Sequence, residues 1–570
     1  MKDPNLVPPT LVDAVNELAR TSSLGFTFVR SDGSERHVPF PELREEARRR
    51  AAHFAARGLS KGDRLAIVVP DPDEFVLSFL GAIFAGVVPV PMVPQLSFKN
   101  VETYHDTVAH IAKASGAKLL LTTESTRPYV EPAAQRVDSL GGILTTSDLA
   151  GPMAGEVDAK VTGDDLCFLQ FTSGSTSKPK GVVVTHRNLA WNSQSFMVNG
   201  LEKDSSFDKG VSWLPLFHDM GLIGFVIGPL FTNIPVVFLP TASFVRNPRI
   251  WLDTIHKHRG TITYAPNFAY QLVSKRLKEK DVEAWDLSCM RRTGCGAEPI
   301  QARTLREFAD KLAPAKFDPK SFIPSYGMAE ATLAITFTPL GKGLRSDRID
   351  PKEREDANAV PSTADDAHEL ANCGRPFPEH EVAIVDEAGN RLPDRKVGEI
   401  VTRGPSICQG YYQEPELTAA AFKDGWLHTG DLGYTVDGEV FVCGRLKDLI
   451  IIRGRNFYPN DLEWVVSELP GVRRGNVVAF SVDGDTGEEL VVCAEAFQSE
   501  AKGLTEAITQ AILGHFALNV YKVVIVPQGT LPRTSSGKAQ RRKTKQMFLS
   551  GQLAQAQRVQ DGPTEPAPSV

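Results

Sequence analysis

Residues 172–181 read TSGSTSKPKG and directly follow a short apolar segment, residues 167–171, that is typical of a buried strand. A loop of this composition is suited to phosphate, because glycine lets the backbone approach an anion and hydroxyl and amide groups donate to its oxygens. Lys178 and Lys180 would offset the charge of that anion. The stretch is not a Walker A loop, because no Gly-Lys-Ser/Thr follows Gly174 at the required spacing. A polar linker is the alternative interpretation.

The bulk composition is that of an ordinary soluble globular protein. At 570 residues the chain is too long for one hydrophobic core, so several domains are expected. A formal net charge of −6 gives no reason to expect a nucleic-acid partner. The 7 cysteines are scattered without a CxxC pair, which favours a reducing, cytoplasmic setting over disulfides or a zinc site. Residues 1–20 carry acids and prolines where a secretory signal would have its apolar core, so export is not expected.

One uncharged segment, residues 75–94, has the length of a membrane span. It also contains Gly86 and three prolines, which would interrupt a spanning helix. We therefore predict no membrane span and expect instead a buried helix that breaks at Gly86 and continues as a short strand.

Strands and helices alternate through the N-terminal half, which predicts an α/β fold with mostly parallel sheets covered by helices. The helices are expected at residues 10–20 and 40–58 and from His186 onward. Arg48, Arg49 and Arg50 are interpreted as the exposed face of the second helix. The expected strands are residues 64–69, 118–122, 181–185, 211–215 and 261–265.

The C-terminal part has a different pattern of polar and apolar residues. Residues 341–371 are polar and nearly without strand pattern, and a long irregular loop of this kind is usually functional or disordered. Strands of a small β unit are expected at residues 382–386 and 397–403, and a tail from about residue 551, rich in Gln, Ala and Pro, is expected to be disordered. Between them we predict an α+β domain with strands 448–452, 474–481, 489–497 and 522–526 and helices 460–468 and 502–517.

Four further motifs accompany TSGSTSKPKG in one order along the chain. They are YGMAEAT (326–332), GWLHTGDLG (425–433), GRLKDLIIIRGRN (444–456) and LPRTSSGK (531–538). Together the five motifs resemble the adenylate-forming superfamily, which includes acyl-CoA synthetases, luciferases, nonribosomal adenylation domains and fatty acyl-AMP ligases. The resemblance implies a large N-terminal domain, residues 1–446, of stacked sheets with a small β subdomain at about 375–445. It also implies a small mobile domain, residues 447–550, that swings about a hinge at Lys447.

The resemblance also implies roles for individual residues. His218, in the run WLPLFHDMGLIG, would line the entrance for the acyl carboxylate; Glu330, with Thr176, would hold the Mg²⁺ that arrives with ATP; and Lys538 would reach the reacting carboxylate. The ATP contacts it implies are Thr172, Ser173, Gly174, Ser175, Thr176 and Lys180 for the phosphates, Gly296, Ala297, Glu298, Ser325, Tyr326, Gly327 and Met328 around the adenine, and Asp431, Arg445 and Lys447 toward the ribose and hinge.

Structural alternatives remain for these residues on sequence grounds. His218 could cap the following helix or satisfy a polar group in the core. Glu330 could be a solvated helix residue, Asp431 a helix cap and Arg445 a surface charge.

Within the superfamily the polar segment 341–371 resembles the insertion that marks fatty acyl-AMP ligases. The expected reaction is therefore formation of a fatty acyl-adenylate from ATP, followed by transfer to the phosphopantetheine thiol of an acyl carrier protein or of a polyketide or nonribosomal synthase carrier domain. A synthetase that uses free CoA is the first alternative, and a non-catalytic lipid or nucleotide sensor is the second. The apolar segments 220–231 and 264–273 favour a medium or long acyl chain, although they could equally be plain core. The protein is expected to act as a monomer.

Overall fold

The computed structural model describes residues 7–95, 101–153, 155, 157, 159–172, 178–484, 487–497, 503–533 and 539–561, the last five of these by their backbone alone. The chain divides into two units that do not follow chain order. The first comprises Met1–Arg345, Ala371–Ala383 and Val401–Thr429, and the second comprises Ser346–Leu370, Ile384–Ile400 and Gly430–Val570. The predicted hinge at Lys447 stays a prediction.

A nine-stranded sheet forms the centre of the first unit. Its order is β17 (Arg375–Pro376), β14 (Ala334–Phe337), β13 (Phe322–Gly327), β12 (Arg292–Cys295), β11 (Ile262–Ala265), β9 (Gly210–Ser212), β10 (Val236–Phe238), β1 (Gly25–Val29) and β2 (Glu35–Pro39). From β13 to β1 the neighbouring strands are parallel, and the antiparallel pairs lie at the two edges. The inner strands β9 to β12 are buried along their whole length, as expected for parallel strands covered on both faces. The predicted α/β class with mostly parallel sheets is confirmed.

A second, fully parallel sheet has the order β4 (Val88–Pro91), β3 (Arg64–Val68), β5 (Ala117–Thr122) and β6 (Ile143–Thr145). The uncharged segment 75–94 begins inside the buried helix α3 (Pro72–Phe84). The chain then turns at Gly86 and continues as β4. Gly86 has φ +67°, a left-handed conformation in which a side chain would be strained. The predicted break at this glycine is confirmed. No helix in the described ranges combines the length and hydropathy needed to cross a bilayer.

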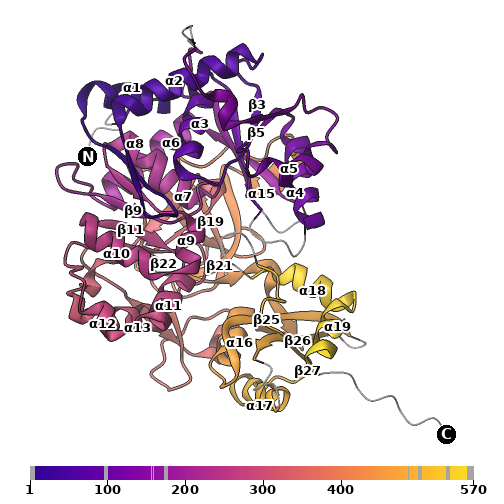
Figure 1. Ribbon diagram of the computed structural model, residues 1–570. Coiled ribbons are helices and arrows are strands. Elements are labelled where there is room, and N and C mark those ends of the chain that lie inside the picture. Colours follow the sequence, from indigo (N-terminus) through magenta and orange to yellow (C-terminus); the bar gives the residue numbers. More distant parts are fainter. Residues whose placement is uncertain are drawn as a thin grey trace. The chain divides into compact units, whose positions relative to one another are not determined.

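Helices cover these sheets. In Figure 1, α1 (Leu11–Thr21), α2 (Phe40–Ala56) and α3 lie together in the N-terminal part of the first unit, and α2 packs on both of the others. The remaining helices of this unit are α4 (Val101–Ser115), α5 (Arg127–Ala134), α6 (His186–Ser193), α7 (Asp219–Leu222), α8 (Gly228–Thr232), α9 (Thr241–Arg246), α10 (Arg249–His258), α11 (Asn267–Arg276), α12 (Glu279–Val282), α13 (Ala302–Leu312) and α15 (Pro415–Ala421).

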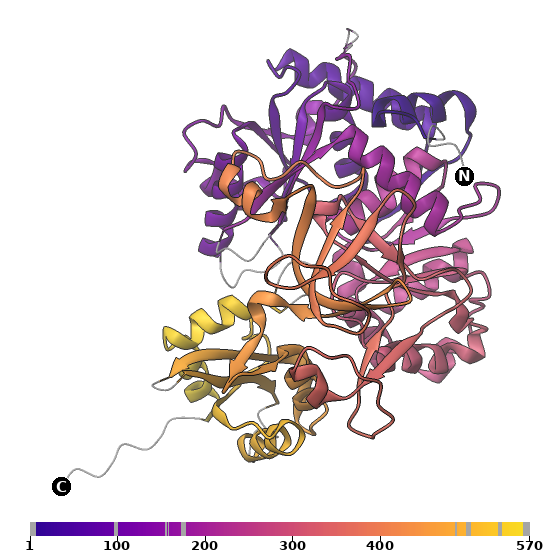
Figure 2. The ribbon, with the colours of Figure 1, turned by 180° about the vertical axis from the view of Figure 1, so that it is seen from behind.

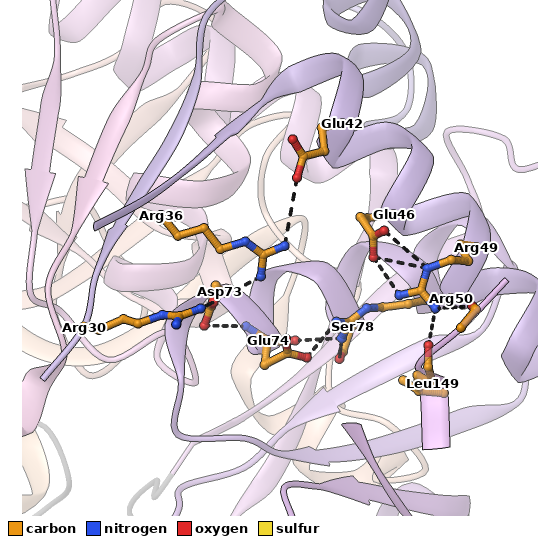
Figure 3. A network of polar contacts seen from close by, with 11 residues as sticks. Arg30, Arg36, Glu42, Glu46, Arg49, Arg50, Asp73, Glu74, Ser78 and Leu149 are labelled. Carbon is orange, nitrogen blue, oxygen red and sulfur yellow. Dashed lines mark hydrogen bonds and ion pairs between the residues drawn. The ribbon is translucent and has the colours of Figure 1, made fainter. Parts of the chain in front are cut away.

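The interpretation of Arg50 as an exposed residue was wrong. Arg50 is 4% exposed, and Figure 3 shows its guanidinium between α2 and α3. There it donates to Glu74 Oε2 at 2.6 Å and to Ser78 Oγ at 2.6 Å. A guanidinium can be buried where acceptors lie opposite its terminal nitrogens, and the acceptors here come from a helix that sequence periodicity alone could not pair with α2.

A third sheet follows later in the chain. The sheet has the order β18 (Glu381–Val385), β19 (Gly398–Arg403), β21 (Trp426–Val436) and β20 (Phe422–Lys423), with β22 (Glu439–Arg445) also paired to β21. The two strands predicted for the small β unit are thus β18 and β19.

The second unit contains a three-stranded sheet of β25 (Val472–Gly484), β26 (Gly487–Ala496) and β27 (Val520–Val526). Alternate residues bury on opposite faces: Val477, Ala479 and Val492 face one cluster, and Val478, Phe480 and Val491 face another. The first cluster includes α16 (Pro459–Ser467) and α17 (Leu504–Phe516), and the second includes α18 (Arg541–Leu549) and α19 (Gln552–Asp561). Figures 1 and 2 show these two helix pairs on either side of the sheet. The unit also has the hairpin of β23 (Ile450–Ile452) and β24 (Arg455–Phe457).

The segment 341–371, which showed almost no strand pattern in the sequence, forms regular structure in part, and the prediction of a disordered tail from about residue 551 was wrong in part. The polar segment 341–371 contains β15 (Ser346–Ile349), α14 (Pro351–Glu355) and β16 (His368–Ala371), and β15 pairs with β16. Its strands are short and polar, so they carry no hydrophobic alternation, and the segment is anchored by the buried side chains of Ile349 and Arg354. The start of the expected tail forms α19, because Leu553 is fully buried on the sheet of the second unit. Residues 562–570 lie outside the described ranges.

Candidate active site

The predicted phosphate loop lies between β7 (Leu166–Thr172) and β8 (Lys180–Thr185). The two strands are antiparallel, and their pairing ends with Thr172 opposite Lys180, so both residues stand at the mouth of the loop. The Thr172 Oγ1 atom is buried and has no hydrogen-bond partner among the described residues. A buried hydroxyl without a partner fits a site that an oxygen-rich ligand fills. The loop residues Ser173, Gly174, Ser175 and Thr176 lie outside the described residues.

Glu330 and Lys180 meet around one tyrosine, Tyr411. Glu330 follows β13 in a short helical turn, Ala329–Ala331, and is 7% exposed. Its Oε1 atom accepts a hydrogen bond of 2.7 Å from the Tyr411 hydroxyl. The Lys180 ammonium lies over the face of the same ring, 3.6 Å from its centroid. Burial lowers the pKa of Lys180, and the Glu330 carboxylate opposes that shift. Glu330 is therefore a buried carboxylate, and the alternative of a solvated helix residue is wrong.

The residues predicted around the adenine come from the ends of two neighbouring strands. β12 and β13 are parallel, with Cys295 opposite Pro324, so the segments after them leave the same edge of the sheet. Gly296, Ala297 and Glu298 follow β12, while Ser325, Tyr326 and Gly327 end β13 and Met328 comes next. Ala297 has φ +70°, a rare conformation for a non-glycine residue that costs about 1 kcal/mol or more. Glu298 fixes the start of α11 by accepting from Phe268 N at 2.5 Å.

His218 immediately precedes α7, at the position of a helix cap, but its side chain makes no capping hydrogen bond. Its ring instead pairs with the carboxylate of Asp219 through Nδ1. Gln170 of β7 donates from Nε2 to the backbone oxygen of Phe217 at 3.1 Å, which ties this segment to the strand that leads into the phosphate loop. The structure thus places His218 beside the strand that ends at Thr172.

Asp431, Arg445 and Lys447 belong to the second unit and form a group of their own. Asp431 on β21 stands opposite Arg445 on β22, and the Arg445 Nε atom lies 3.1 Å from Asp431 Oδ1. Asp431 is 7% exposed, while Arg445 is exposed. Lys447 lies in the helical turn Leu446–Asp448 that follows β22. Desolvation, with a further contribution from the Arg445 guanidinium, lowers the pKa of Lys447 to about 8. Lys538 lies outside the described residues.

The donor set around Glu330 fits Mg²⁺ that arrives with a nucleotide. No group of three His, Cys, Asp or Glu side chains in the described part of the chain could hold a metal by itself. Magnesium is usually held by one or two carboxylates together with substrate phosphates and water, so the single buried carboxylate of Glu330 is a suitable protein ligand.

Two residues of this candidate site, Tyr411 and Gln170, were not predicted from the sequence. Tyr411 stands in the run CQGYYQEP, and Gln170 lies inside a strand that reads as plain core. Neither carries a signal of charge or spacing, because each matters through partners that are distant along the chain: Glu330 is 81 positions from Tyr411 and Phe217 is 47 positions from Gln170.

The chain is similar to known proteins over most of its length. Residues 18–412 match the family model described as AMP-binding enzyme, and residues 447–558 match the model described as Disco-interacting protein 2-like, AMP domain. The chain is 38% identical to a Caulobacter vibrioides protein whose provisional name is acyl-CoA synthetase, over 95% of this chain and 96% of the relative. It is 32% identical to long-chain-fatty-acid–AMP ligase FadD32 of Mycolicibacterium smegmatis, over 93% of this chain and 92% of the relative.

Among solved structures, one from a study of fatty acyl-adenylate ligases of E. coli and L. pneumophila superposes with a TM-score of 0.90. The two chains are 34% identical, and the match covers 96% of this chain and 99% of the other.

Proposed function

Because the chain belongs to the AMP-binding enzyme family, we propose that it is a fatty acyl-AMP ligase that uses ATP and Mg²⁺. The observation that carries the proposal is that Glu330 and Lys180 both contact Tyr411, close to the point where the predicted phosphate loop ends at Lys180. Its support is the match, over more than nine tenths of the chain, to proteins named fatty acid–AMP ligases. AMP-binding enzymes use ATP, which agrees with a loop suited to phosphates.

In the first half-reaction a carboxylate oxygen of the fatty acid attacks the α-phosphorus of ATP. The bond from that phosphorus to the bridging oxygen breaks, and pyrophosphate leaves with the electron pair. The attacking carboxylate, the phosphates of ATP and the leaving pyrophosphate are all anionic. The site must therefore supply positive charge and fixed hydrogen-bond donors. Lys180 and Thr172 would face the phosphates, Glu330 would hold Mg²⁺, and Mg²⁺ when bound would neutralise phosphate charge. The roles of His218 at the acyl carboxylate and of Lys538 at the reacting oxygens are carried over from the family resemblance.

In the second half-reaction a thiol attacks the acyl carbonyl, and AMP leaves. We propose that the thiol is the phosphopantetheine of an acyl carrier protein, that the acyl chain is medium or long, and that the protein acts as a monomer in the cytoplasm. Free CoA is the competing acceptor, and the name of the Caulobacter relative favours it.

The test is a mass-spectrometric assay of the purified protein with ATP, Mg²⁺ and fatty acids of mixed length. Parallel reactions contain no thiol, free CoA, or a phosphopantetheinylated carrier protein. We expect acyl-AMP to accumulate without a thiol, to persist with CoA and to be consumed by the carrier. Efficient formation of acyl-CoA would identify a CoA ligase instead, and a Glu330→Gln variant that makes as much acyl-AMP as the wild type would contradict the assignment of the site.

A further inference from the structure

Tyr411 separates two opposite charges that would otherwise attract each other. Lys180 and Glu330 both contact this one side chain, the lysine at the ring face and the carboxylate at the hydroxyl. They make no direct ion pair with each other, although the negative charge of Glu330 opposes the lowering of the Lys180 pKa by burial. A partly buried ammonium and a buried carboxylate attract each other more strongly than the same charges do in water.

The backbone of Tyr411 cannot move aside to let them meet. Its neighbours are hydrogen-bonded to β8, the strand that begins with Lys180: Val183 N donates to Gly410 O at 3.0 Å and Tyr412 N donates to Gly181 O at 2.7 Å. Tyr411 N donates to Thr418 Oγ1 at 2.9 Å. Gly410 has φ +136°, and a side chain there would collide with Thr418, so the turn before Tyr411 requires glycine.

The ring itself is also fixed. Tyr411 is 7% exposed and its ring packs edge-on against Phe422, with centroids 6.1 Å apart. A rigid ring in this position gives each charge a partner that does not neutralise it. The hydroxyl orients the Glu330 carboxylate through one oxygen and leaves the other oxygen for a cation. The ring face holds the Lys180 ammonium without removing its charge, which keeps it available to an anion.

We propose that Tyr411 is a positioning residue that keeps Lys180 available to the nucleotide phosphates and Glu330 available to the metal ion. This assignment rests on the proposed function of the site. The assignment makes two separable predictions. Loss of the Tyr411 hydroxyl alone should affect only Glu330, whereas loss of the whole ring should affect both Glu330 and Lys180.

The test measures binding directly, with Mn²⁺ as the probe ion because it shares the octahedral oxygen coordination of Mg²⁺. Free Mn²⁺ is followed by electron paramagnetic resonance in the presence of ATP, and ATP binding without metal is followed by calorimetry in EDTA. Tyr411→Phe should weaken Mn²⁺ binding about tenfold and leave metal-free ATP binding unchanged. Tyr411→Leu should weaken both, because Lys180 can then pair with Glu330.

Tyr412→Phe is the matched control, since it removes a hydroxyl one position along the chain, and it should change neither constant. Thermal unfolding should show the same midpoint for the two Phe variants as for the wild type. Unchanged Mn²⁺ binding in Tyr411→Phe, or an equal loss of metal-free ATP binding in that variant, would overturn the proposal. A wild-type protein that binds Mn²⁺ with ATP but forms no acyl-AMP would contradict the ligase function and leave this test intact.

Discussion

At the scale of single residues, Arg354 shows how a charge can hold a polar segment in place. Its side chain is 1% exposed, donates to Asp461 Oδ2 at 2.7 Å and to the backbone oxygen of Cys443 at 3.1 Å, and lies over the Tyr458 ring. Burial lowers the pKa of Arg354, but the negative charge of Asp461, together with the nearby Cys443, Tyr458 and Tyr434 groups, raises it above its usual value. The guanidinium therefore stays charged inside the second unit.

Removing the negative partner of this buried pair should be costly. Asp461→Asn leaves the Arg354 guanidinium buried without a counter-ion, and we expect the unit that contains both to lose about 3 kcal/mol of stability. Differential scanning calorimetry of the full chain measures the loss as a lower midpoint for the transition of that unit. The double variant Arg354→Met/Asp461→Leu should be more stable than Asp461→Asn, because no isolated charge remains. An Asp461→Asn protein as stable as the wild type would show that water reaches Arg354.

At the scale of elements, His186 connects the starts of two helices. It is the first residue of α6, is 2% exposed, and its Nδ1 atom accepts a hydrogen bond of 3.2 Å from the backbone of Leu11, the first residue of α1. Burial lowers the pKa of His186 to about 4. The folded protein therefore holds this ring neutral at pH values where the unfolded chain protonates it.

The consequence is a loss of stability in mild acid. Between the unfolded pKa near 6.5 and the folded pKa near 4, the unfolded chain binds a proton that the folded chain does not, so the free energy of unfolding falls as the pH falls. A shift of this size corresponds to about 3 kcal/mol, most of it lost by pH 4 and almost none of it lost at pH 7. Urea unfolding of the wild type and His186→Asn at pH 7 and pH 5 should show a smaller loss in the variant, whose amide oxygen can still accept from Leu11.

His37→Gln, at an exposed position, is the control for that experiment and should keep the wild-type difference between the two pH values. Equal losses of stability between pH 7 and pH 5 in the wild type and in His186→Asn would mean that the folded protein does not lower the pKa of His186.

The elements also show which parts of the structure the sequence can predict. Inner strands such as β11, the glycine break after α3 and the alternation in β25 were predictable, because each depends on local hydrophobic pattern or backbone sterics. The formation of regular helices at α14 and α19 was not predictable from the sequence. Their residues are mostly polar, and they are held by single buried side chains, Arg354 and Leu553, whose partners lie elsewhere in the chain.

The same distinction applies to the residues of the candidate site: some were predictable from the sequence and others were not. Glu330 and Lys180 were predicted because charged residues in recurrent motifs are visible in a sequence. Tyr411 was missed because its role depends on the hydrogen bonds that bring residues 410–412 to β8. No local pattern records a contact of that kind.

At the scale of the whole molecule, the family resemblance implies a small C-terminal domain, residues 447–550, that swings about a hinge, and we propose that it moves between the two half-reactions. Lys447 is the predicted hinge and lies in the turn Leu446–Asp448. Lys447→Pro would fix φ near −65° and restrict rotation there. We expect the variant to form acyl-AMP at a rate within a few fold of wild type and to transfer the acyl group to the thiol at least tenfold more slowly.

Rapid-quench mass spectrometry of acyl-AMP and thioester separates the two steps. Lys447→Ala is the control, because it removes the side chain while leaving the backbone free, and it should keep the ratio of the two rates. A proline variant that transfers at the wild-type rate would place the hinge elsewhere.

The division of the chain into two units also has a consequence for its synthesis. Arg354 is translated 107 residues before Asp461, its partner within the second unit. At about 5–20 residues per second, the ribosome needs roughly 5–20 s to deliver that aspartate. Residues 401–429 of the first unit emerge during the same interval. Neither unit can therefore be completely synthesised before synthesis of the other has begun, and Arg354 must wait without its aspartate partner during that interval.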